Sequence, residues 1–243
     1  MTTHRDDGSL RLDEALERLG RISLADHSMR SLLDLVASLA HRSLPGRPEA
    51  SVTLMKGSRP YTAAFSGALA KSLDESQYGH GYGPCLEAAT SGDVVEVLDT
   101  RTDTRWPGYI EAAARHGCRS SLSVPLPLHE GVTGGLNVYA REPAAFDDDS
   151  REGAPRLASY AAVAAGNMLL YEDAVARAAN LEVALRSRAV IDQAKGMLME
   201  RFRLTADQAF QALAQVSMER NRKVRDIAER FVESGELAVP AVR

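Results

Sequence analysis

A long run of residues without glycine or proline is the feature that most constrains how this chain can fold. From Tyr171 to Asp192 the sequence reads YEDAVARAANLEVALRSRAVID and is rich in alanine, leucine, glutamate and arginine. These residues lose little conformational freedom in a helix. We therefore predict that this run continues the helix expected just before it, without a break, and that it separates a larger N-terminal part from a smaller C-terminal part.

The N-terminal part alternates between helix-like and strand-like patterns. Helices are predicted where apolar residues recur every three or four positions, and strands where short apolar runs end at turn residues. In chain order the segments are LRLDEALERLGRIS and SMRSLLDLVASLAHRSL (helices), ASVTLMKG and YTAAFSGA (a strand hairpin around SRP), GPCLEAATSG (helix), DVVEVLDT (strand), WPGYIEAAARHG (helix), a strand pair in CRSSLSVPLPLHEGVTGGLNVYA, and the helix that starts within FDDDSREGAPRLASYAAVAAGNMLLYEDA. This order predicts an α+β fold with a central antiparallel sheet flanked by helices.

GYGPCLEAATSGDVVEVLD, followed by GCRSSLSVPLPLHEGVTGGLNVYAREPAAFDDD, resembles a GAF domain, a sensory fold related to PAS, over roughly residues 19–171. The resemblance implies that this part senses a signal. GAF domains that bind cyclic nucleotides carry an Asn-Lys-Phe-Asp-Glu signature. The segment AAFDDD matches only its acidic end and lacks the lysine, so a cyclic nucleotide is unsupported. No cofactor is predicted, and the small-molecule ligand stays unknown.

Cys85 and Cys118 are the only cysteines, which fits a reducing compartment without a disulfide framework. Cys85 is a possible redox sensor if a helix N-terminus lowers its pKa, but a small buried residue is the preferred interpretation. His80, in YGHGYG, is interpreted as a loop residue in preference to a haem ligand. A GAF-fold reductase of free methionine sulfoxide needs an arrangement of several cysteines, and this chain has only two. No metal-ligand spacing and no nucleophile–base pairing is readable, so we predict neither a metal site nor an enzyme.

The C-terminal part predicts three short amphipathic helices. Val190, Ala194, Leu198 and Phe202 recur every four residues on the first. Thr205 and Gln208 have the spacing of a capping box at the start of the second, and Gly235 is expected to end the third. The apolar faces of the second and third helices are Ala209, Phe210, Leu213 and Val216, and then Val224, Ile227, Ala228 and Phe231. Three helices with one shared apolar side predict a compact bundle, and we expect all three phenylalanines in its core.

The run between the two parts carries a narrow apolar seam. Its residues lie three or four positions apart and are Val175, Ala178, Leu181, Leu185 and Ala189. A plain connecting helix explains this spacing, but a parallel two-chain coiled coil is favoured, and with it a homodimer. Alanine at several seam positions would hold the register weakly, as suits a signalling linker.

SRAVIDQAKGMLMERFRLTADQAFQALAQVSMERNRKVRDIAERFV resembles the ANTAR domain over about 46 residues. It carries the family's Ala-Lys-Gly, the following Leu-Met-Glu-Arg, the Ala-Phe pair of the second helix, and a polar and basic turn before the third. It departs at Asp192, where glutamate is more usual, and at Arg203, where the turn often has glycine. The resemblance implies binding to paired stem-loops in nascent RNA and transcription antitermination.

Positive charge gathers in this part of the chain. Residues 186–230 hold ten Lys or Arg against six Asp or Glu, although the whole chain has a formal net charge of −4. On a domain that resembles an RNA binder, a lysine excluded from a tight bundle is expected to contact phosphate. The predicted RNA-binding residues are Arg188, Lys195, Gly196, Arg220, Asn221, Arg222 and Lys223.

Two of these residues have alternative roles. Gly196 costs about 1 kcal/mol of helix stability relative to alanine, so we expect a close backbone approach there. That approach is either by the third helix, which is the preferred reading, or by RNA. Asn221 is expected either to contact a base edge or to cap the third helix.

We therefore predict a signal-responsive antiterminator with the following organisation: residues 1–10, disordered tail; 11–171, GAF-like sensor; 172–186, helical or coiled-coil linker; 187–235, RNA-binding bundle; 236–243, tail. A helix-turn-helix DNA-binding regulator, suggested by VRDIAERF, and a partner-binding dimerisation module are the alternatives. No apolar run approaches the roughly 20 residues of a membrane span, and MTTHRDDGSL has no signal-peptide core. These features predict a cytoplasmic protein.

Overall fold

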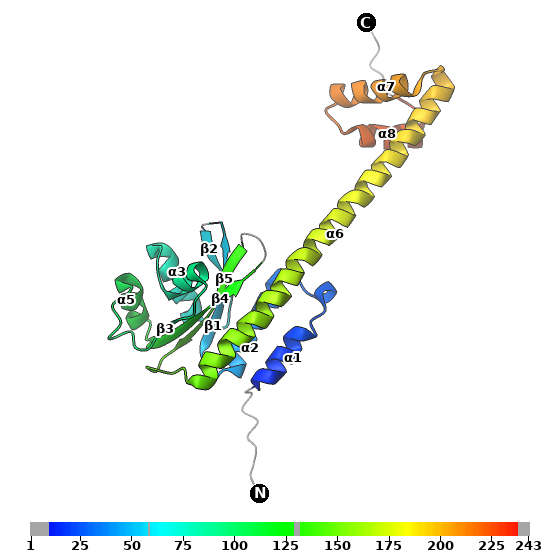
Figure 1. Cartoon of the computed structure of the whole chain (residues 1–243). Coiled ribbons are helices and arrows are strands. Elements are labelled where there is room, and N and C mark those ends of the chain that lie inside the picture. Colours follow the sequence, from blue (N-terminus) through cyan, green and yellow to red (C-terminus); the bar gives the residue numbers. More distant parts are fainter. Residues whose placement is uncertain (1–9, 58, 129–131, 238–243) are drawn as a thin grey trace. The chain divides into compact units, whose positions relative to one another are not determined.

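A computed structural model describes residues 10–57, 59–128 and 132–237 of the chain. It divides into two compact units, Met1–Tyr171 and Glu172–Arg243 (Figure 1). The predicted tails lie largely outside the described residues, as do Ser58 in the first hairpin turn and 129–131 in the second.

The N-terminal unit is built on a five-stranded sheet in the order β2-β1-β5-β4-β3. Its strands are β1 (Glu49–Lys56), β2 (Arg59–Phe65), β3 (Val95–Val97), β4 (Ser120–Pro127) and β5 (Val132–Ala140). Every neighbouring pair is antiparallel. The predicted α+β fold with a central antiparallel sheet is therefore confirmed.

The helices of this unit are α1 (Leu12–Gly20), α2 (Met29–Ser43), α3 (Ala68–His80), α4 (Pro84–Ser91) and α5 (Pro107–Arg115), with a 3-10 turn η1 (Leu24–Asp26). Local signals set several of their ends. Pro84 is the first residue of α4, where its missing N–H costs nothing. Gly117, just past α5, takes the left-handed conformation that the sequence predicted.

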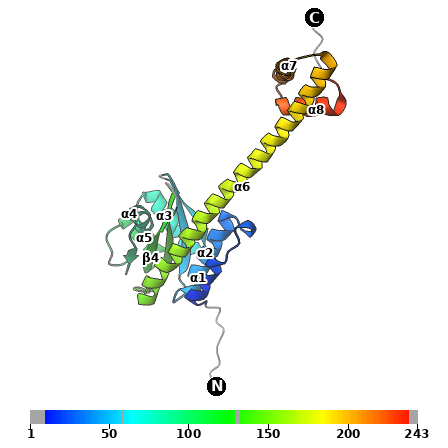
Figure 2. The same cartoon turned by 45° about the vertical axis from the view of Figure 1, so that its right-hand side comes forward.

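The two faces of the sheet differ in chemistry. On one face, alternate strand residues such as Val52, Leu122 and Val138 form an apolar core with α1, α2 and the first turns of α6 (Asp148–Phe202). The other face is covered by α3, α4 and α5 (Figures 1 and 2). There Trp106 and Tyr109 are in the apolar cluster, but the strands themselves contribute mostly polar side chains.

Helix α6 runs unbroken for 55 residues, from Asp148 to Phe202. Asp147 accepts hydrogen bonds from the backbone N–H of Ser150 at 2.9 Å and from its hydroxyl at 2.7 Å. This cap satisfies an N–H group at the helix start, as the acidic run FDDD predicted. The Gly- and Pro-free run from Tyr171 to Asp192 is therefore helical throughout.

Candidate functional site

The C-terminal unit is a three-helix bundle made by the end of α6, α7 (Ala206–Glu219) and α8 (Val224–Ser234). Its core consists of small and aliphatic side chains from all three helices and one aromatic: Ala194, Leu198, Ala209, Leu213, Val216, Ile227, Ala228 and Phe231. The predicted apolar faces supply this core, and the remaining faces of the helices carry the charged side chains.

Short-range signals define the helix ends in this bundle. Thr205 and Gln208 form the predicted capping box, and Gly235 ends α8 in a left-handed conformation. Arg203 has a φ of 55°, a conformation that glycine adopts without cost. The departure from the family pattern at this position thus places a long cationic side chain on a strained backbone in the α6–α7 connection.

Lys195 and Arg188 lie seven residues apart on one face of α6, with Asp192 between them. The Lys195 Nζ is 3.1 Å from the Asp192 Oδ1, and the Arg188 Nε is 3.7 Å from its Oδ2. The Lys195 side chain is 25% exposed, whereas that of Arg188 is 83% exposed. Lys195 therefore extends along the helix surface and holds an ion pair that an incoming phosphate would have to share or displace.

The expected contact between Gly196 and the third helix is wrong. Gly196 is exposed, and a Cβ built on it would meet nothing within 4 Å. Packing inside this unit therefore does not require the glycine. The bare backbone beside Lys195 faces open space, where another molecule is free to approach closely.

This geometry predicts the effect of Gly196→Ala. Because the methyl group meets no neighbour and the φ is not left-handed, the substitution should raise the free energy of unfolding by about 0.5–1 kcal/mol. Chemical denaturation followed by circular dichroism would measure this change. A loss of stability would show that an internal contact does depend on the glycine.

The turn between α7 and α8 contains the other predicted residues, Arg220 to Lys223. Asn221 has a φ of 48°, a left-handed conformation that asparagine tolerates better than most residues. The expectation that it caps the third helix is wrong, because Lys223 is the N-cap residue and forms no side-chain cap. Two hydrogen bonds close the turn. The Ser217 hydroxyl donates to the Arg222 carbonyl, and the Arg222 backbone N–H donates to the Ser217 carbonyl. The cationic side chains therefore extend from a fixed backbone.

Two of the three phenylalanines lie outside the core, contrary to expectation. Phe202 is 54% exposed and Phe210 is 44% exposed, whereas Phe231 is buried as predicted. The Arg201 guanidinium lies 5.6 Å from the centre of the Phe202 ring. Helical spacing placed all three on apolar faces, but of those faces Leu198 and Ala209 are buried in the core whereas Phe202 and Phe210 stay exposed.

The cations form two groups rather than one. Arg188 and Lys195 lie on α6, while the α7–α8 turn lies at the end of α7 away from the α6–α7 connection (Figures 1 and 2). A 14-residue helix is about 21 Å long. A ligand that contacts both groups must therefore reach from α6 to the far end of α7.

The interior of the sensor unit contains a polar network that sequence reasoning missed. It centres on Asp74 of α3, which is fully buried. The Tyr139 hydroxyl donates to its Oδ1 at 2.5 Å and the Thr62 hydroxyl to its Oδ2 at 2.9 Å. The hydrogen bonds join helix α3 to the central strand β5 and the edge strand β2.

More polar side chains extend the network across the sheet. Gln77 donates to the Tyr139 hydroxyl at 3.3 Å and accepts from the Cys85 backbone N–H at 2.8 Å. Asn137 donates to the hydroxyl groups of Ser51 at 3.3 Å and Thr53 at 3.1 Å. The network therefore holds α3 and α4 against the strands by directional bonds, where the other face of the sheet uses apolar packing.

Burial raises the pKa of Asp74 from 3.8 to about 6, and its hydrogen bonds oppose the rise. The titratable groups facing it are Tyr78, Cys85, Tyr109 and Tyr139, and burial raises the pKa of each. The largest causes of the pKa shift of Asp74 are its burial and the opposing hydrogen bonds of neutral neighbours such as Tyr139. Asp74 is therefore the member of this network whose charge changes near neutral pH.

Cys85 is fully buried at the start of α4, and its thiol donates to the Thr53 hydroxyl at 3.2 Å. Burial, followed by the nearby Asp74, raises the pKa of this thiol to about 12. A redox role depended on a lowered pKa, because the thiolate is the reactive form. That condition is not met, and the preferred interpretation as a small buried residue agrees with the structure. His80 is the last residue of α3, not a loop residue.

Among residues 10–57, 59–128 and 132–237, no group of three or more His, Cys, Asp or Glu side chains is placed to hold a metal ion. Over the same described ranges, no helix combines the length and hydropathy needed to cross a membrane.

Comparison with known proteins identifies both parts of the chain. A GAF domain family model matches residues 26–165, and an ANTAR domain model matches residues 179–232. No match was found among curated protein sequences.

Solved structures match the N-terminal part in fold. The phycoerythrobilin-bound GAF domain of a cyanobacterial phytochrome is 15% identical with a TM-score of 0.53, over 67% of this chain and 98% of that domain. The free methionine-R-sulfoxide reductase of Neisseria meningitidis, solved with its substrate, is 21% identical with a TM-score of 0.51, over 70% of this chain and 97% of that enzyme. At these identities the likeness shows the fold alone. With its GAF model matching more than half of the sequence, the chain belongs to the GAF domain family and joins a GAF domain to a C-terminal ANTAR domain.

Proposed function

We propose that the protein is a signal-responsive regulator whose C-terminal bundle binds RNA stem-loops in nascent transcripts and prevents termination. The observation that carries this proposal is the ANTAR match over residues 179–232. It is supported by the position of the cationic side chains outside the bundle core, on α6 and on the α7–α8 turn.

The surface suits a folded RNA with unpaired loop bases. Lys195, Arg188, Arg222 and Lys223 would contact phosphates, and the left-handed Asn221 would present its amide to a base edge. The exposed rings of Phe202 and Phe210 add a feature that the sequence did not predict, since unpaired bases stack on aromatic side chains. The open backbone at Gly196 would allow a phosphate group to approach without a side chain in the way.

In this proposal the active form is a cytoplasmic homodimer, and each protomer binds one stem-loop of a pair. Linking two weak sites raises the apparent affinity through effective concentration. The GAF domain would control the pairing through α6 in response to a small-molecule signal. Both matched domains are regulatory, so we propose no catalytic role.

Replacing Lys195 or Arg222 by alanine tests the proposed interface. Each variant should weaken RNA binding without unfolding the bundle, because neither side chain is in the core. Each lost phosphate contact should lower the log–log salt dependence of the binding constant by about 0.7. Titration of a two-hairpin RNA at several salt concentrations would measure this slope.

Arg186→Ala is the matched control. The Arg186 side chain is 79% exposed and pairs with Glu182, and it lies on the opposite side of α6 from Lys195. Its loss should leave the slope unchanged. Equal affinities and slopes for all three variants and the native protein, with unchanged circular dichroism, would remove Lys195 and Arg222 from the interface.

A further inference from the structure

A groove lies between α7 and α8 on the surface of the C-terminal bundle. It has a volume of about 360 Å³ and is open to solvent. Its lining residues come from the end of α7, from α8 and from the segment just after α8: Val216, Arg220, Ile227, Arg230, Glu233, Ser234, Glu236 and Leu237. Of the RNA-binding residues predicted from the sequence, the lining includes only Arg220.

The floor of the groove is apolar and held in place. Val216 and Ile227 are almost fully buried and belong to the bundle core. The end of α8 is fixed by two hydrogen bonds to Gly235. The Arg201 guanidinium donates to the Gly235 carbonyl at 2.6 Å, and the Gly235 N–H donates to the Phe231 carbonyl at 2.8 Å. A ligand therefore meets an apolar surface that is already formed.

The rim of the groove is charged, and the two signs lie at different places along it. Arg220 lies beside the α7–α8 turn, whereas Glu233 and Glu236 lie at and just beyond the C-terminal end of α8. Arg230 is three residues before Glu233. All four residues are exposed. With the residues that the structure describes, Arg230 and Glu233 form no ion pair, so both stay available to a ligand.

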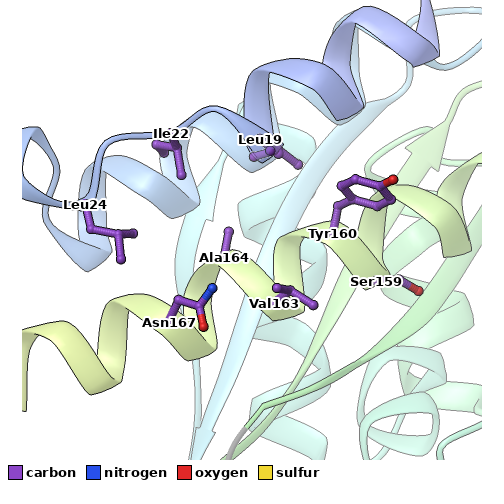
Figure 3. A pocket seen from close by; sticks show the side chains of 9 residues that line it. Leu19, Ile22, Leu24, Ser159, Tyr160, Val163, Ala164 and Asn167 are labelled. Carbon is purple, nitrogen blue, oxygen red and sulfur yellow. The ribbon is translucent and has the colours of Figure 1, made fainter.

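This charged rim distinguishes the groove from one in the sensor unit. The sensor groove has a volume of about 410 Å³ and lies between the α1–η1 segment and α6, with Leu19, Ile22, Leu24 and Val163 among its walls (Figure 3). None of the described residues that line it is charged. The bundle groove, by contrast, suits a ligand that combines an apolar face with a negative charge and with hydrogen-bond donors.

We propose that the groove binds one unpaired nucleotide of the RNA, with the base on the apolar floor and the phosphate at the end beside the turn. A nucleotide has all three features, because its base has flat faces and a donor-bearing edge and is joined to a phosphate. Arg220 contacts the phosphate, and the Arg230 guanidinium stacks on the base. This assignment rests on the proposed function and gives one part of the RNA a place on the same domain.

The carboxylates at the other end of the groove restrict the base. Ionised Glu233 and Glu236 accept hydrogen bonds and cannot donate them. Adenine, guanine and cytosine each have an exocyclic amino group that donates, whereas uracil has none. The carboxylates also repel phosphate, so the nucleotide has one orientation. The groove therefore selects a base with an amino group.

Removing the RNA bases one at a time locates the nucleotide. The probe is a hairpin RNA in which each unpaired base in turn is replaced by an abasic site, which keeps the phosphate. At one position the loss of the base should weaken binding about tenfold, as expected for the loss of one stacked base. Glu233→Phe, which fills the groove, should weaken binding of the intact RNA by a similar factor. In this variant the abasic site at that position should have no further effect.

Glu229→Phe is the matched control. Glu229 is also an exposed glutamate of α8, one turn earlier, but it does not line the groove. Its replacement removes the same charge and adds the same ring, so the base effect should persist at every position. Circular dichroism would confirm that both variants are folded. At the position found, the native protein should prefer cytosine to uracil, and Glu233→Gln, which keeps the shape of the side chain, should reduce that preference.

The groove is not the nucleotide site if no position of the RNA responds to Glu233→Phe, or if Glu229→Phe has the same effect. It is also not the site if a base effect appears only after residues 238–243, which follow Leu237 directly, are removed, because those residues would then be its occupant. The proposed function has a separate readout. Hairpin binding by the native protein without any base coupled to Glu233 would keep the function and reject the groove, whereas no binding to hairpin RNA would reject both.

Discussion

Replacing Asp74 by asparagine should stabilise the sensor unit at pH 7.5 and remove part of its pH dependence. The native carboxylate is fully buried, and burial raises its pKa from 3.8 to about 6. A difference of about 2 pKa units corresponds to about 3 kcal/mol between the two protonation states. Asparagine has nearly the same shape and carries no charge, so the variant should recover up to about this amount at neutral pH.

The direction follows from proton binding. Between about pH 4 and pH 6 the folded protein holds a proton on Asp74 more often than the unfolded chain does. The contribution of this group to the free energy of unfolding is therefore present below about pH 4, falls as the pH rises to about 6, and stays low above that. Other carboxylates have their own pH dependence, so the difference between the variant and the native protein isolates Asp74.

Trp106 provides the signal for this experiment. It is the only tryptophan of the chain and is buried in the same layer as α3, so its fluorescence reports on the sensor unit alone. Urea denaturation at pH 5.0, 6.0 and 7.5 should show the variant gaining stability over the native protein as the pH rises. A constant difference across the three pH values would show that Asp74 does not titrate in this range.

Introducing aspartate at both Leu181 and Leu185 should abolish preferential binding to paired stem-loops. Both side chains are exposed, at 62% and 59%, and they occupy the apolar seam of the linker. Two new charges there would repel the partner helix. Because linked sites gain on the order of 100-fold or more in avidity, binding to a two-hairpin RNA should weaken by about that factor, while binding to one hairpin stays nearly the same.

The matched control places the same two charges on the other side of the helix. Ala176 and Asn180 are exposed and lie opposite the seam, so Ala176→Asp with Asn180→Asp should keep both the dimer and its RNA preference. Sedimentation and RNA titration of both double variants would decide the matter. An equal loss in the two would mean that added charge, rather than a broken seam, weakens binding.

Features specified by neighbouring residues could be predicted from the sequence. The Thr205–Gln208 capping box and the glycine that ends α8 depend on hydrogen bonds and backbone conformation within a few positions. The strand hairpins and the long α6 follow in the same way from apolar periodicity and from the placement of glycine and proline. These elements define the antiparallel sheet and the bundle.

Helix α3 could not be recognised by the same criteria. Its buried residues Leu69, Ala70, Leu73, Asp74 and Gln77 have helical spacing, but two of the five are polar. A search for apolar stripes misses a helix that faces a polar interior. The partners of Asp74 come from β2 and β5, which are brought together only by the fold, so neither the network nor the shifted pKa of Asp74 could be predicted.

The candidate interface shows the same limit. Periodicity placed Phe202 and Phe210 on apolar faces, but which member of a broad face enters the core depends on how three helices pack. Gly196 was assigned to packing for the same reason, although it faces open space. A cap on α8 was one of the two roles expected for Asn221, whereas the N-cap residue is Lys223, two residues later.

Titration of the full-length protein with three nucleic acids of similar length, at one salt concentration, would show whether it selects paired stem-loops. The three nucleic acids are an RNA with two hairpins, the same RNA with one hairpin disrupted, and a duplex DNA. We expect the tightest binding to the two-hairpin RNA, at least tenfold weaker binding to the single hairpin, and only weak, salt-sensitive binding to DNA. Equal or tighter binding to the duplex, or no binding to either RNA, would contradict this expectation.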